Sequence, residues 1–399
     1  MRSRSLLSGV MAALAAMTWT LATAGPASPA EPEGPCALVR TTVHHSEGVD
    51  SWNGSYTRPL GRIDAALVFL SFPDSTPTVS TRELADDHIP DTRDYFRTAS
   101  YGRFDYHLDP VPGYVRMPTA STGYGIERDW NPKDRRRYLR DAVAAADPLV
   151  DFSAYDVVFF VADPEAPGVD PDATKIVNLG RPIVADGVRL DHMGTIFEAH
   201  PPDHHVLAHE SAHIFDLPDL YTRPGDGAPA GEWNTRVGDW DLMGDQKGLS
   251  PELFAWHKWK FGWLDGGQVA CLAKPGTVRR TLTPVERPGG VKLLVVPIDS
   301  SSVYAVEVRS LEGNDAQGCT EGVLVYRVRS DVGSGSGPIR VMDAHPDSAA
   351  CSGRSVFSPL ADAPFGAGSA FRDLAHEVVV RVLGRGPDGS YTVEATRNR

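Results

Sequence analysis

Two closely spaced histidines, with a glutamate directly after the first, constrain this chain more than any other feature. His209 and His213 are four residues apart, so in a helix they lie on one face, where two imidazoles can hold one metal ion. Glu210 follows the first histidine and can reach a water molecule at that ion. This H-E-x-x-H spacing predicts a zinc-binding helix, which we expect to begin after Pro201-Pro202-Asp203.

A third ligand is expected shortly after this helix, because a catalytic zinc takes three protein ligands and keeps one open position. Pro218 cannot continue a helix, so the helix should end near Phe215 or Asp216. Asp219, six residues after His213, then lies where a turn can return its carboxylate to the metal. Asp216 is a competing carboxylate, and we favour Asp219.

The alternative to a metal site is an ordinary helix with two unrelated histidines, since the motif alone is only moderately specific. The helix stop and the carboxylate behind it favour the metal. The other histidines are weaker candidates. We expect a solvent-facing position for His204 and His205, a structural role rather than one in the cleft for His192, and a surface position for His44 and His45.

A loop rich in Pro and Gly carries three aspartates, Asp163, Asp170 and Asp172. Such oxygen clusters can bind Ca²⁺ in extracellular proteins, although no EF-hand spacing is present. A solvated loop is the favoured alternative. Ca²⁺ is therefore a second, weaker cofactor prediction beside one catalytic Zn²⁺.

The N-terminus has the pattern of a secretory signal. Arg2 and Arg4 precede an apolar run, and Ala22-Thr23-Ala24 offers a small-x-small cleavage site. We expect a signal peptide over 1–24, a flexible lead-in over 25–35, and a secreted protein without stable membrane insertion; a retained N-terminal anchor is the alternative. The net charge of −13 opposes a phosphate-binding surface, so nucleic acid is not an expected partner.

The four cysteines can be interpreted once export is assumed. An even count in an oxidising compartment predicts two disulfides, with three possible connectivities. The expected domain organisation favours Cys36–Cys271 and Cys319–Cys351. The alternative for Cys36 is a thiolate that blocks the metal site in a precursor.

The pattern of helices and strands changes along the chain, whose 399 residues suffice for two domains. Residues 36–273 mix both kinds of signal, as in α/β or α+β domains, and residues 274–399 carry short β-rich runs typical of an antiparallel β-sandwich. In the first region we expect a helix at 135–146 and strands at 65–72, 104–108 and 156–161. In the second we expect strands at 292–297, 303–309, 322–329, 339–341, 376–382 and 390–395.

The zinc segment HESAHIFDLPDLY, His209 to Tyr221, resembles the extended motif of metzincin-type proteases and, most closely, that of the immune inhibitor A family of secreted bacterial metallopeptidases. GDWDLMG at 238–244 is similar to that family's Met-turn, and FAWHKWKFGWL at 254–264 is similar to the helix that follows it. Further similar stretches are FLSFPD at 69–74, TASYGRFDY at 98–106 and EGVLVYRV at 321–328.

The resemblance implies an α+β fold in which a metzincin-like zinc protease domain precedes an antiparallel β-sandwich domain. It also implies His209, His213 and Asp219 as zinc ligands, with Met243 beneath the metal. The family usually has Gly at the position of Asp216, where the chain turns in a left-handed conformation. Asp adopts this conformation at a cost of about 1 kcal/mol, so we expect the turn to survive.

These patterns together predict a zinc endopeptidase that acts on polypeptides, with Glu210 as general base to a water that the metal acidifies. Tyr221 is a candidate for stabilising the oxyanion, and the 239–245 segment is expected to accept hydrogen bonds from the imidazoles. The oligomeric state stays open. Two rivals also stay open: a catalytically weakened zinc-containing extracellular binding protein, with Asp216 as the sign of decay, and a hydrolase of a non-peptide substrate such as a cell-wall glycan.

Overall fold

The computed structural model describes residues 36–197, 204–223 and 233–398. The expected signal peptide, the whole of the expected lead-in and the expected helix start at Pro201-Pro202-Asp203 lie outside the described residues. Residues 31–399 form one compact unit, and the expected domain boundary at 273/274 stays a prediction. Within the described ranges, no helix combines the length and the apolar character needed to cross a bilayer.

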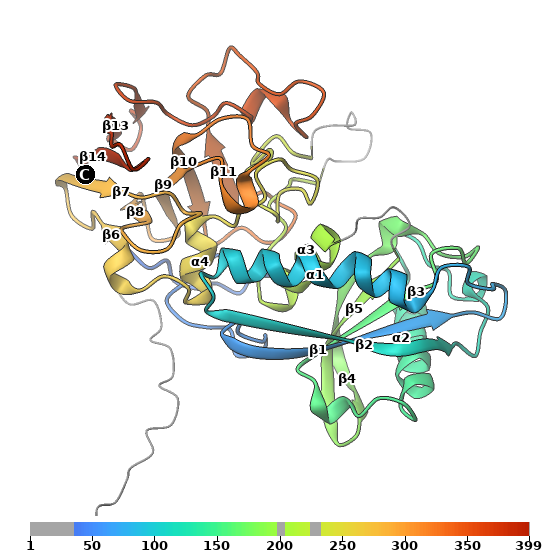
Figure 1. Ribbon diagram of the computed structural model, residues 1–399. Coiled ribbons are helices and arrows are strands. Elements are labelled where there is room, and N and C mark those ends of the chain that lie inside the picture. Colours follow the sequence, from blue (N-terminus) through green and yellow to red (C-terminus); the bar gives the residue numbers. More distant parts are fainter. Residues whose placement is uncertain (1–35, 198–203, 224–232, 399) are drawn as a thin grey trace, which may run out of the picture. The chain divides into compact units, whose positions relative to one another are not determined.

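The first part of the chain builds a five-stranded mixed sheet (Figure 1). Its strands are β1 (Gly61–Ser71), β2 (Phe104–Arg116), β3 (Val157–Ala162), β4 (Lys175–Ala185) and β5 (Val188–Ile196), in the order β2-β1-β3-β5-β4. β1 is parallel to β2 and β3, β3 is parallel to β5, and β4 is antiparallel to β5. Residues 65–70 of β1 are fully buried, which explains their continuous apolar run.

The three strands expected in this region are confirmed as β1, β2 and β3, while β4 and β5 were not predicted. β4 contains Gly180 and Pro182, which are typical of turns in a sequence. It lies at the edge of the sheet, where proline is tolerated because one side of the strand needs no ladder hydrogen bonds.

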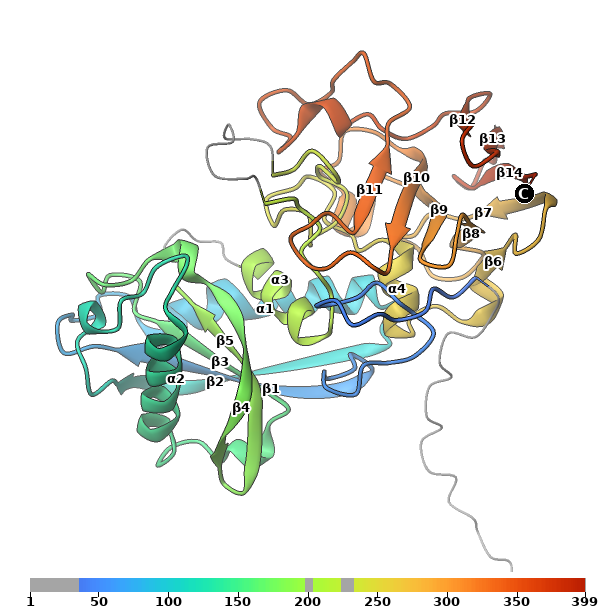
Figure 2. The same ribbon diagram turned by 180° about the vertical axis from the view of Figure 1, so that it is seen from behind.

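Four α-helices are described: α1 (Thr81–Ala99), α2 (Pro132–Ala146), α3 (His204–Ile214) and α4 (Ala255–Phe261). α2 confirms the helix expected at 135–146. α1 was missed, although Ser80 and Glu83 form a capping box at its start, because Pro90 interrupts a largely polar sequence. Figures 1 and 2 show α1 and α3 on one face of the sheet and α2 on the other.

The last part of the chain forms two further sheets, with strand orders β11-β10-β9-β8-β6 and β12-β13-β14-β7. Strand neighbours are antiparallel except for the parallel pair of β6 and β8. Side chains from both sheets share one buried cluster, among them Val306 and Val380. The strands are β6 (Val269–Cys271), β7 (Gly276–Leu282), β8 (Leu293–Pro297), β9 (Ser302–Arg309), β10 (Gly322–Arg329), β11 (Ile339–Met342), β12 (Ala370–Asp373), β13 (Val378–Arg385) and β14 (Tyr391–Arg397).

All six strands expected after residue 274 are confirmed, as β8, β9, β10, β11, β13 and β14. The short strands β6 and β12 and the mostly exposed strand β7 were not predicted. The helices and sheets of the described residues are compatible with the α+β class. The finer assignment to a metzincin-like domain stays a prediction.

Both disulfides have the favoured pairing, Cys36–Cys271 and Cys319–Cys351. The first joins the beginning of the described chain to β6, and the second closes a loop in the C-terminal part. Together the two disulfides use all the cysteines of the described residues, and Cys36 is one of them. The alternative of a Cys36 thiolate at the metal site is therefore wrong. Two disulfides fit a protein that folds in an oxidising compartment.

Candidate metal centre

The three expected zinc ligands converge at the end of α3. His209 and His213 lie one turn apart on this helix, with ring centroids separated by 4.8 Å. Oδ1 of Asp219 lies 3.3 Å from Nε2 of His209 and 3.2 Å from Nε2 of His213. One ligand atom from each residue lies within 4.8 Å of the others. Two imidazole nitrogens and one carboxylate oxygen form a donor set that zinc accepts.

Backbone carbonyls fix the direction of both imidazoles. Nδ1 of His209 lies 3.0 Å from the carbonyl oxygen of Leu242, and Nδ1 of His213 lies 2.8 Å from that of Leu217. A carbonyl oxygen only accepts, so in the neutral rings each Nδ1 carries the hydrogen and each Nε2 offers its lone pair to the cluster. Metal-binding histidines are usually held in this way. Leu242 lies in the 239–245 segment, where such an acceptor was expected.

A left-handed turn ends α3 and returns the chain toward the histidines. The helix stops at Ile214, close to the expected position, and Asp216 has a φ of 65°. The N–H of Asp216 donates to the His213 carbonyl at 3.1 Å, and the N–H of Leu217 donates to that of Ala212 at 3.0 Å. These bonds form a Schellman motif with Asp216 in the position that usually holds glycine. The expectation that Asp would support this turn is confirmed.

The Asp216 carboxylate binds the segment that follows Cys36. Oδ2 accepts a hydrogen bond from Nη1 of Arg40 at 2.8 Å, and Oδ1 lies 3.0 Å from Nδ1 of His45. Lys260 Nζ lies 3.8 Å from Oδ2. Burial raises the pKa of Asp216, but Lys260, the hydrogen bond to His45 and the charge of Arg40 outweigh this and lower it to about 2. The competing carboxylate therefore already has protein partners for both oxygens.

Asp216→Asn is expected to destabilise the protein by about 2–3 kcal/mol at neutral pH. Asn tolerates the left-handed turn but removes the charge that compensates Arg40 and Lys260. The folded-state pKa of Asp216 lies below its ordinary value of 3.8, so its contribution is complete above that pH and is lost as the pH falls toward about 2. Urea unfolding of the wild type and the variant, at neutral pH and at acidic pH values down to about 2, measures the difference in their free energies of unfolding.

Asp331→Asn is the matched control, because Asp331 forms a surface pair with Arg329 at 2.8 Å. An exposed pair contributes about 0–1 kcal/mol, so this variant should unfold close to wild type. Equal destabilisation by both substitutions, or a loss at Asp216 that does not change with pH, would contradict the role assigned to the buried charge.

Glu210 lies next to the first histidine with its side chain buried. Its Oε2 atom has no hydrogen-bond partner among the described residues. Burial raises the pKa of Glu210, and the positive imidazoles of His213 and His209 oppose this rise. Buried carboxylate oxygens normally find a partner. Oε2 is thus available to a water or substrate group next to the candidate ligands.

Asp219 and His213 stabilise one another's charged forms. Burial raises the pKa of Asp219, but the charge of His213 and hydrogen bonds from both histidines lower it well below its usual value. Burial lowers the pKa of His213, but the charge of Asp219 and the hydrogen bond to it raise this pKa to about 9. A divalent ion that binds these atoms would therefore compete with a proton on His213.

The two expected supporting residues flank the ligand loop. Met243 is fully buried, and its carbonyl accepts from the N–H of Leu220 at 2.9 Å, directly beside Asp219. Burial and then the negative charge of Asp219 raise the pKa of Tyr221, so its hydroxyl stays protonated at neutral pH. The position of Met243 beneath a metal and the oxyanion role of Tyr221 stay predictions.

Asp241 is a supporting residue that sequence reasoning did not single out. Its Oδ1 accepts from the N–H of Met243 at 2.8 Å, and its Oδ2 lies 2.9 Å from Nδ1 of the buried His257. Nε2 of His257 lies 2.9 Å from Oε1 of Glu47. Burial lowers the pKa of His257, but the two carboxylates raise it to about 9. In the sequence this residue is visible only as the second aspartate of GDWDLMG. Its contact with His257 of α4 becomes apparent only in the fold.

The histidines at 44 and 45 were expected at the surface, and for His45 this is wrong. His45 is 4% exposed, and its ring stacks on that of His213 with centroids 5.6 Å apart. It is buried because its Nδ1 reaches Asp216, a contact 171 residues away in sequence. His44 is exposed as expected.

His192 and His205 have hydrogen-bonding partners within the fold. Nδ1 of His192 lies 2.6 Å from Oδ1 of Asn178, and its Nε2 lies 2.7 Å from the Ser55 carbonyl, as a structural role requires. His205 is half-buried rather than solvent-facing, because its Nδ1 lies 3.0 Å from the carbonyl of Gln246. The side chain of His204 lies outside the described structure.

The three loop aspartates considered for Ca²⁺ have separate partners. Asp163 binds the Ser75 hydroxyl, Asp170 accepts from the N–H of Asp172 at 3.0 Å, and Asp172 pairs with Arg128 at 2.7 Å. The structure does not bring these three carboxylates together into one of the ligand groups found in the described ranges. Ca²⁺ in this loop stays a prediction.

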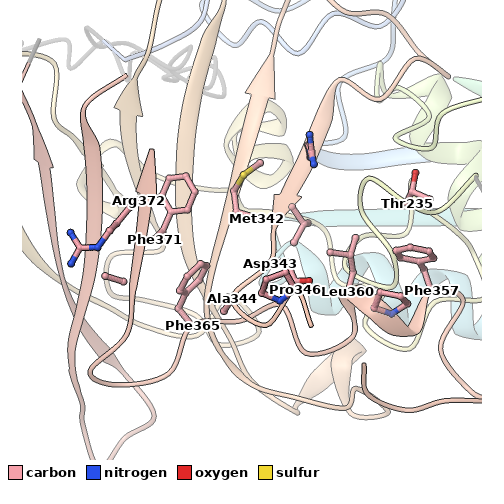
Figure 3. A pocket seen from close by; sticks show the side chains of 14 residues that line it. Thr235, Met342, Asp343, Ala344, Pro346, Phe357, Leu360, Phe365, Phe371 and Arg372 are labelled. Carbon is pink, nitrogen blue, oxygen red and sulfur yellow. The ribbon is translucent and has the colours of Figure 1, made fainter. Parts of the chain in front are cut away.

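A hollow of about 570 Å³ lies next to β11 and β12. Figure 3 shows the side chains that line it, which include Phe357, Phe365 and Phe371 beside polar ones such as Asp343 and Arg372. None of the candidate zinc ligands lines it. Nearby, Asp343, His345 and Asp362 form a second group of ligand-type side chains. His345 is exposed and hydrogen-bonded within this loop, and no sequence signal pointed to the group.

No protein-family model matches the chain, and no curated protein matches it. The resemblance to the immune inhibitor A family therefore stays an expectation from the motifs.

Proposed function

We propose that this protein is a secreted zinc endopeptidase of the immune inhibitor A type, which cleaves polypeptides at the site formed by α3 and the loop behind it. The observation that carries the proposal is the convergence of His209, His213 and Asp219. Glu210, the residue directly after His209, adds a buried Oε2 that has no hydrogen-bond partner among the described residues. A helix that only supported the fold would need neither three ligand atoms within 4.8 Å of one another nor, on the residue after the first ligand, a buried carboxylate oxygen without a partner in the described part of the chain.

The number of candidate ligands, their chemical type and the hydrogen bonds that hold them all fit a zinc ion. Nε2 of His209, Nε2 of His213 and a carboxylate oxygen of Asp219 would hold the ion, which leaves an open position, as catalytic zinc sites require. The Leu242 and Leu217 carbonyls already orient the two rings. Zinc, when bound, would supply a Lewis acid that polarises the substrate carbonyl and makes water more acidic.

Glu210 would move the proton. Its Oε2 would take a proton from the attacking water and deliver it to the leaving amine, which must depart as a neutral group. Burial raises the pKa of this carboxyl, which makes it a better proton acceptor than an exposed glutamate. Tyr221 would remain a neutral hydrogen-bond donor near Asp219, in line with the expected role in stabilising the oxyanion.

The rival proposal of an inactive binding protein drew its support from Asp216. That residue adopts the left-handed conformation of the glycine that it replaces, and its carboxylate is bound by Arg40 and His45. Asp216 therefore does not favour a decayed site. Extracellular action is supported by the two disulfides and by the signal pattern of the sequence.

Metal removal tests the proposal. We expect the purified protein to contain zinc and to digest casein, and a chelator to remove at least about 99% of this activity, because the metal both binds and activates the reactants. Added zinc should restore it. Zinc without digestion of casein or of a peptide library would favour the binding protein, cleavage of cell-wall glycan alone would favour the other rival, and full proteolysis by zinc-free protein would exclude the proposed site.

A further inference from the structure

A turn of the C-terminal sheet pairs with the loop that carries the third candidate ligand. Thr222 and Ser336 form an antiparallel bridge. The N–H of Gly335 donates to the carbonyl of Asp219 at 3.0 Å, and the N–H of Arg223 donates to that of Gly335 at 3.0 Å. Two segments more than 100 residues apart in sequence thus run side by side at the site. One is the turn between β10 and β11, and the other is the loop that directly follows α3.

Ser334 forms two reciprocal hydrogen bonds with Asp219. Its hydroxyl accepts from the N–H of Asp219 at 2.9 Å and donates to Oδ2 of the same residue at 2.9 Å. One carboxylate oxygen is therefore engaged by the serine. The other, Oδ1, is the atom that lies between the Nε2 atoms of His209 and His213.

The same turn is held from its other side by the segment that follows Cys36. The N–H of Ser334 donates to the carbonyl of His44 at 3.1 Å. At the start of the turn, the carbonyl of Ser330 accepts from the hydroxyl of Ser46 at 2.7 Å and from that of Thr41 at 2.5 Å. Contacts on both sides restrict the turn, so Ser334 presents its hydroxyl from a fixed position.

We propose that the turn between β10 and β11 is part of the metal centre and that Ser334 is a positioning residue for Asp219. This inference rests on the proposed zinc site and extends it, because the region expected to be a separate β-sandwich domain supplies the hydrogen bond that orients a ligand. A free aspartate on a loop would lose side-chain freedom when it binds metal. The hydrogen bond from Ser334 restricts the Asp219 side chain before any metal binds. It also leaves Oδ1 directed at the two histidines.

Ser334→Ala in the full-length protein tests this role. Loss of a hydrogen bond to a metal ligand typically weakens metal affinity by about 10–100-fold, and we expect that increase in the zinc dissociation constant. Competition with a chromophoric chelator measures it without reference to activity. Ser334 is half-exposed, so the alanine leaves no core cavity and the variant should fold.

Two variants make the test specific. Ser336→Ala makes the same change two residues along the same turn, at an exposed side chain that forms no hydrogen bond with Asp219 among the described residues, and should bind zinc like wild type. Ser334→Thr keeps the hydroxyl and should recover most of the affinity. A merely structural role would lower the melting temperature of zinc-free Ser334→Ala and leave its zinc affinity unchanged, and this result would overturn the inference.

The outcomes separate this inference from the proposed function. A wild-type protein that binds no zinc overturns both. A wild-type protein that binds zinc and cleaves peptides, beside a Ser334→Ala variant that binds zinc equally tightly, overturns the positioning role alone. Equal weakening by Ser334→Ala and Ser336→Ala also overturns it, because the loss would then belong to the turn and not to the hydroxyl.

Discussion

Glu210→Gln is expected to remove nearly all peptide cleavage and to leave the fold and the zinc content unchanged. Gln has the same shape, but its amide cannot accept a proton from water at neutral pH. A positioned general base contributes about 10²–10⁴-fold to the rate, so kcat/KM should fall by at least about that factor. Casein digestion, metal content and far-UV circular dichroism, measured on the same preparation, check the three parts of this expectation.

Two further substitutions show whether the carboxylate itself is responsible. Glu210→Asp keeps the charge but withdraws the oxygen by one methylene, so activity should be intermediate. Glu127→Gln changes an exposed glutamate in the same way and should have no effect. A Glu210→Gln protein that retains activity would remove Glu210 from the general-base role, and a variant that loses zinc would assign it a structural role instead.

The local part of the site could be predicted because short-range rules determine it. Helical periodicity places His209 and His213 on one face, and Pro218 requires the helix to stop. The turn that follows needs a left-handed residue, which Asp216 supplies. The shared face of the histidines, the helix stop and the position of Asp219 therefore follow from spacing within eleven residues, whereas the left-handed turn was expected from the resemblance to the immune inhibitor A family.

The supporting contacts could not be predicted, because they join segments that no periodic pattern relates. Asp216 meets Arg40 and His45 across more than 170 residues, and Asp219 meets Ser334 across 115. Isolated polar residues in loops give no signal for such pairs. Helix α1 was missed for another reason: its capping box is local, but burial of its apolar residues against the sheet outweighs a proline and a polar composition that argue against a helix.

Arg309→Met is expected to destabilise the protein by about 3–5 kcal/mol, because it would leave buried acids without their counter-charge. Arg309 lies in β9, and its side chain is completely buried. It pairs with Glu286 at 3.4 Å, with Glu307 at 3.2 Å and with Asp315 at 2.5 Å. Met fills a similar volume but offers none of these acids a hydrogen bond. Urea unfolding at pH 7 measures the loss.

The same guanidinium connects β9 to the loop around the candidate metal centre. It donates to the carbonyls of Trp240 at 2.9 Å, Ser250 at 3.2 Å and Glu252 at 3.0 Å. This loop includes Leu242, whose carbonyl orients His209, the first candidate ligand. Arg309→Met should therefore weaken zinc binding as well, even under conditions in which the variant remains folded.

The pH dependence distinguishes lost charge compensation from a simple packing defect. Burial and the negative charge of Asp315 raise the pKa of Glu286 to about 8, and Arg309 opposes this rise. A carboxyl whose folded-state pKa exceeds its unfolded value of 4.5 favours folding fully below that value and loses this contribution as the pH rises through about 8. Without the arginine this pKa should rise further, so the deficit of the variant should be larger at pH 8 than at pH 5.

Arg340→Met provides the control, since Arg340 is an exposed residue of β11, and the change should alter stability by no more than about 0.5 kcal/mol. A deficit in Arg309→Met that is the same at pH 5 and pH 8 would point to packing alone. A deficit no larger than that of the control would mean that the three acids stay neutral in the folded protein, because only neutral carboxyls can remain buried there without a counter-charge.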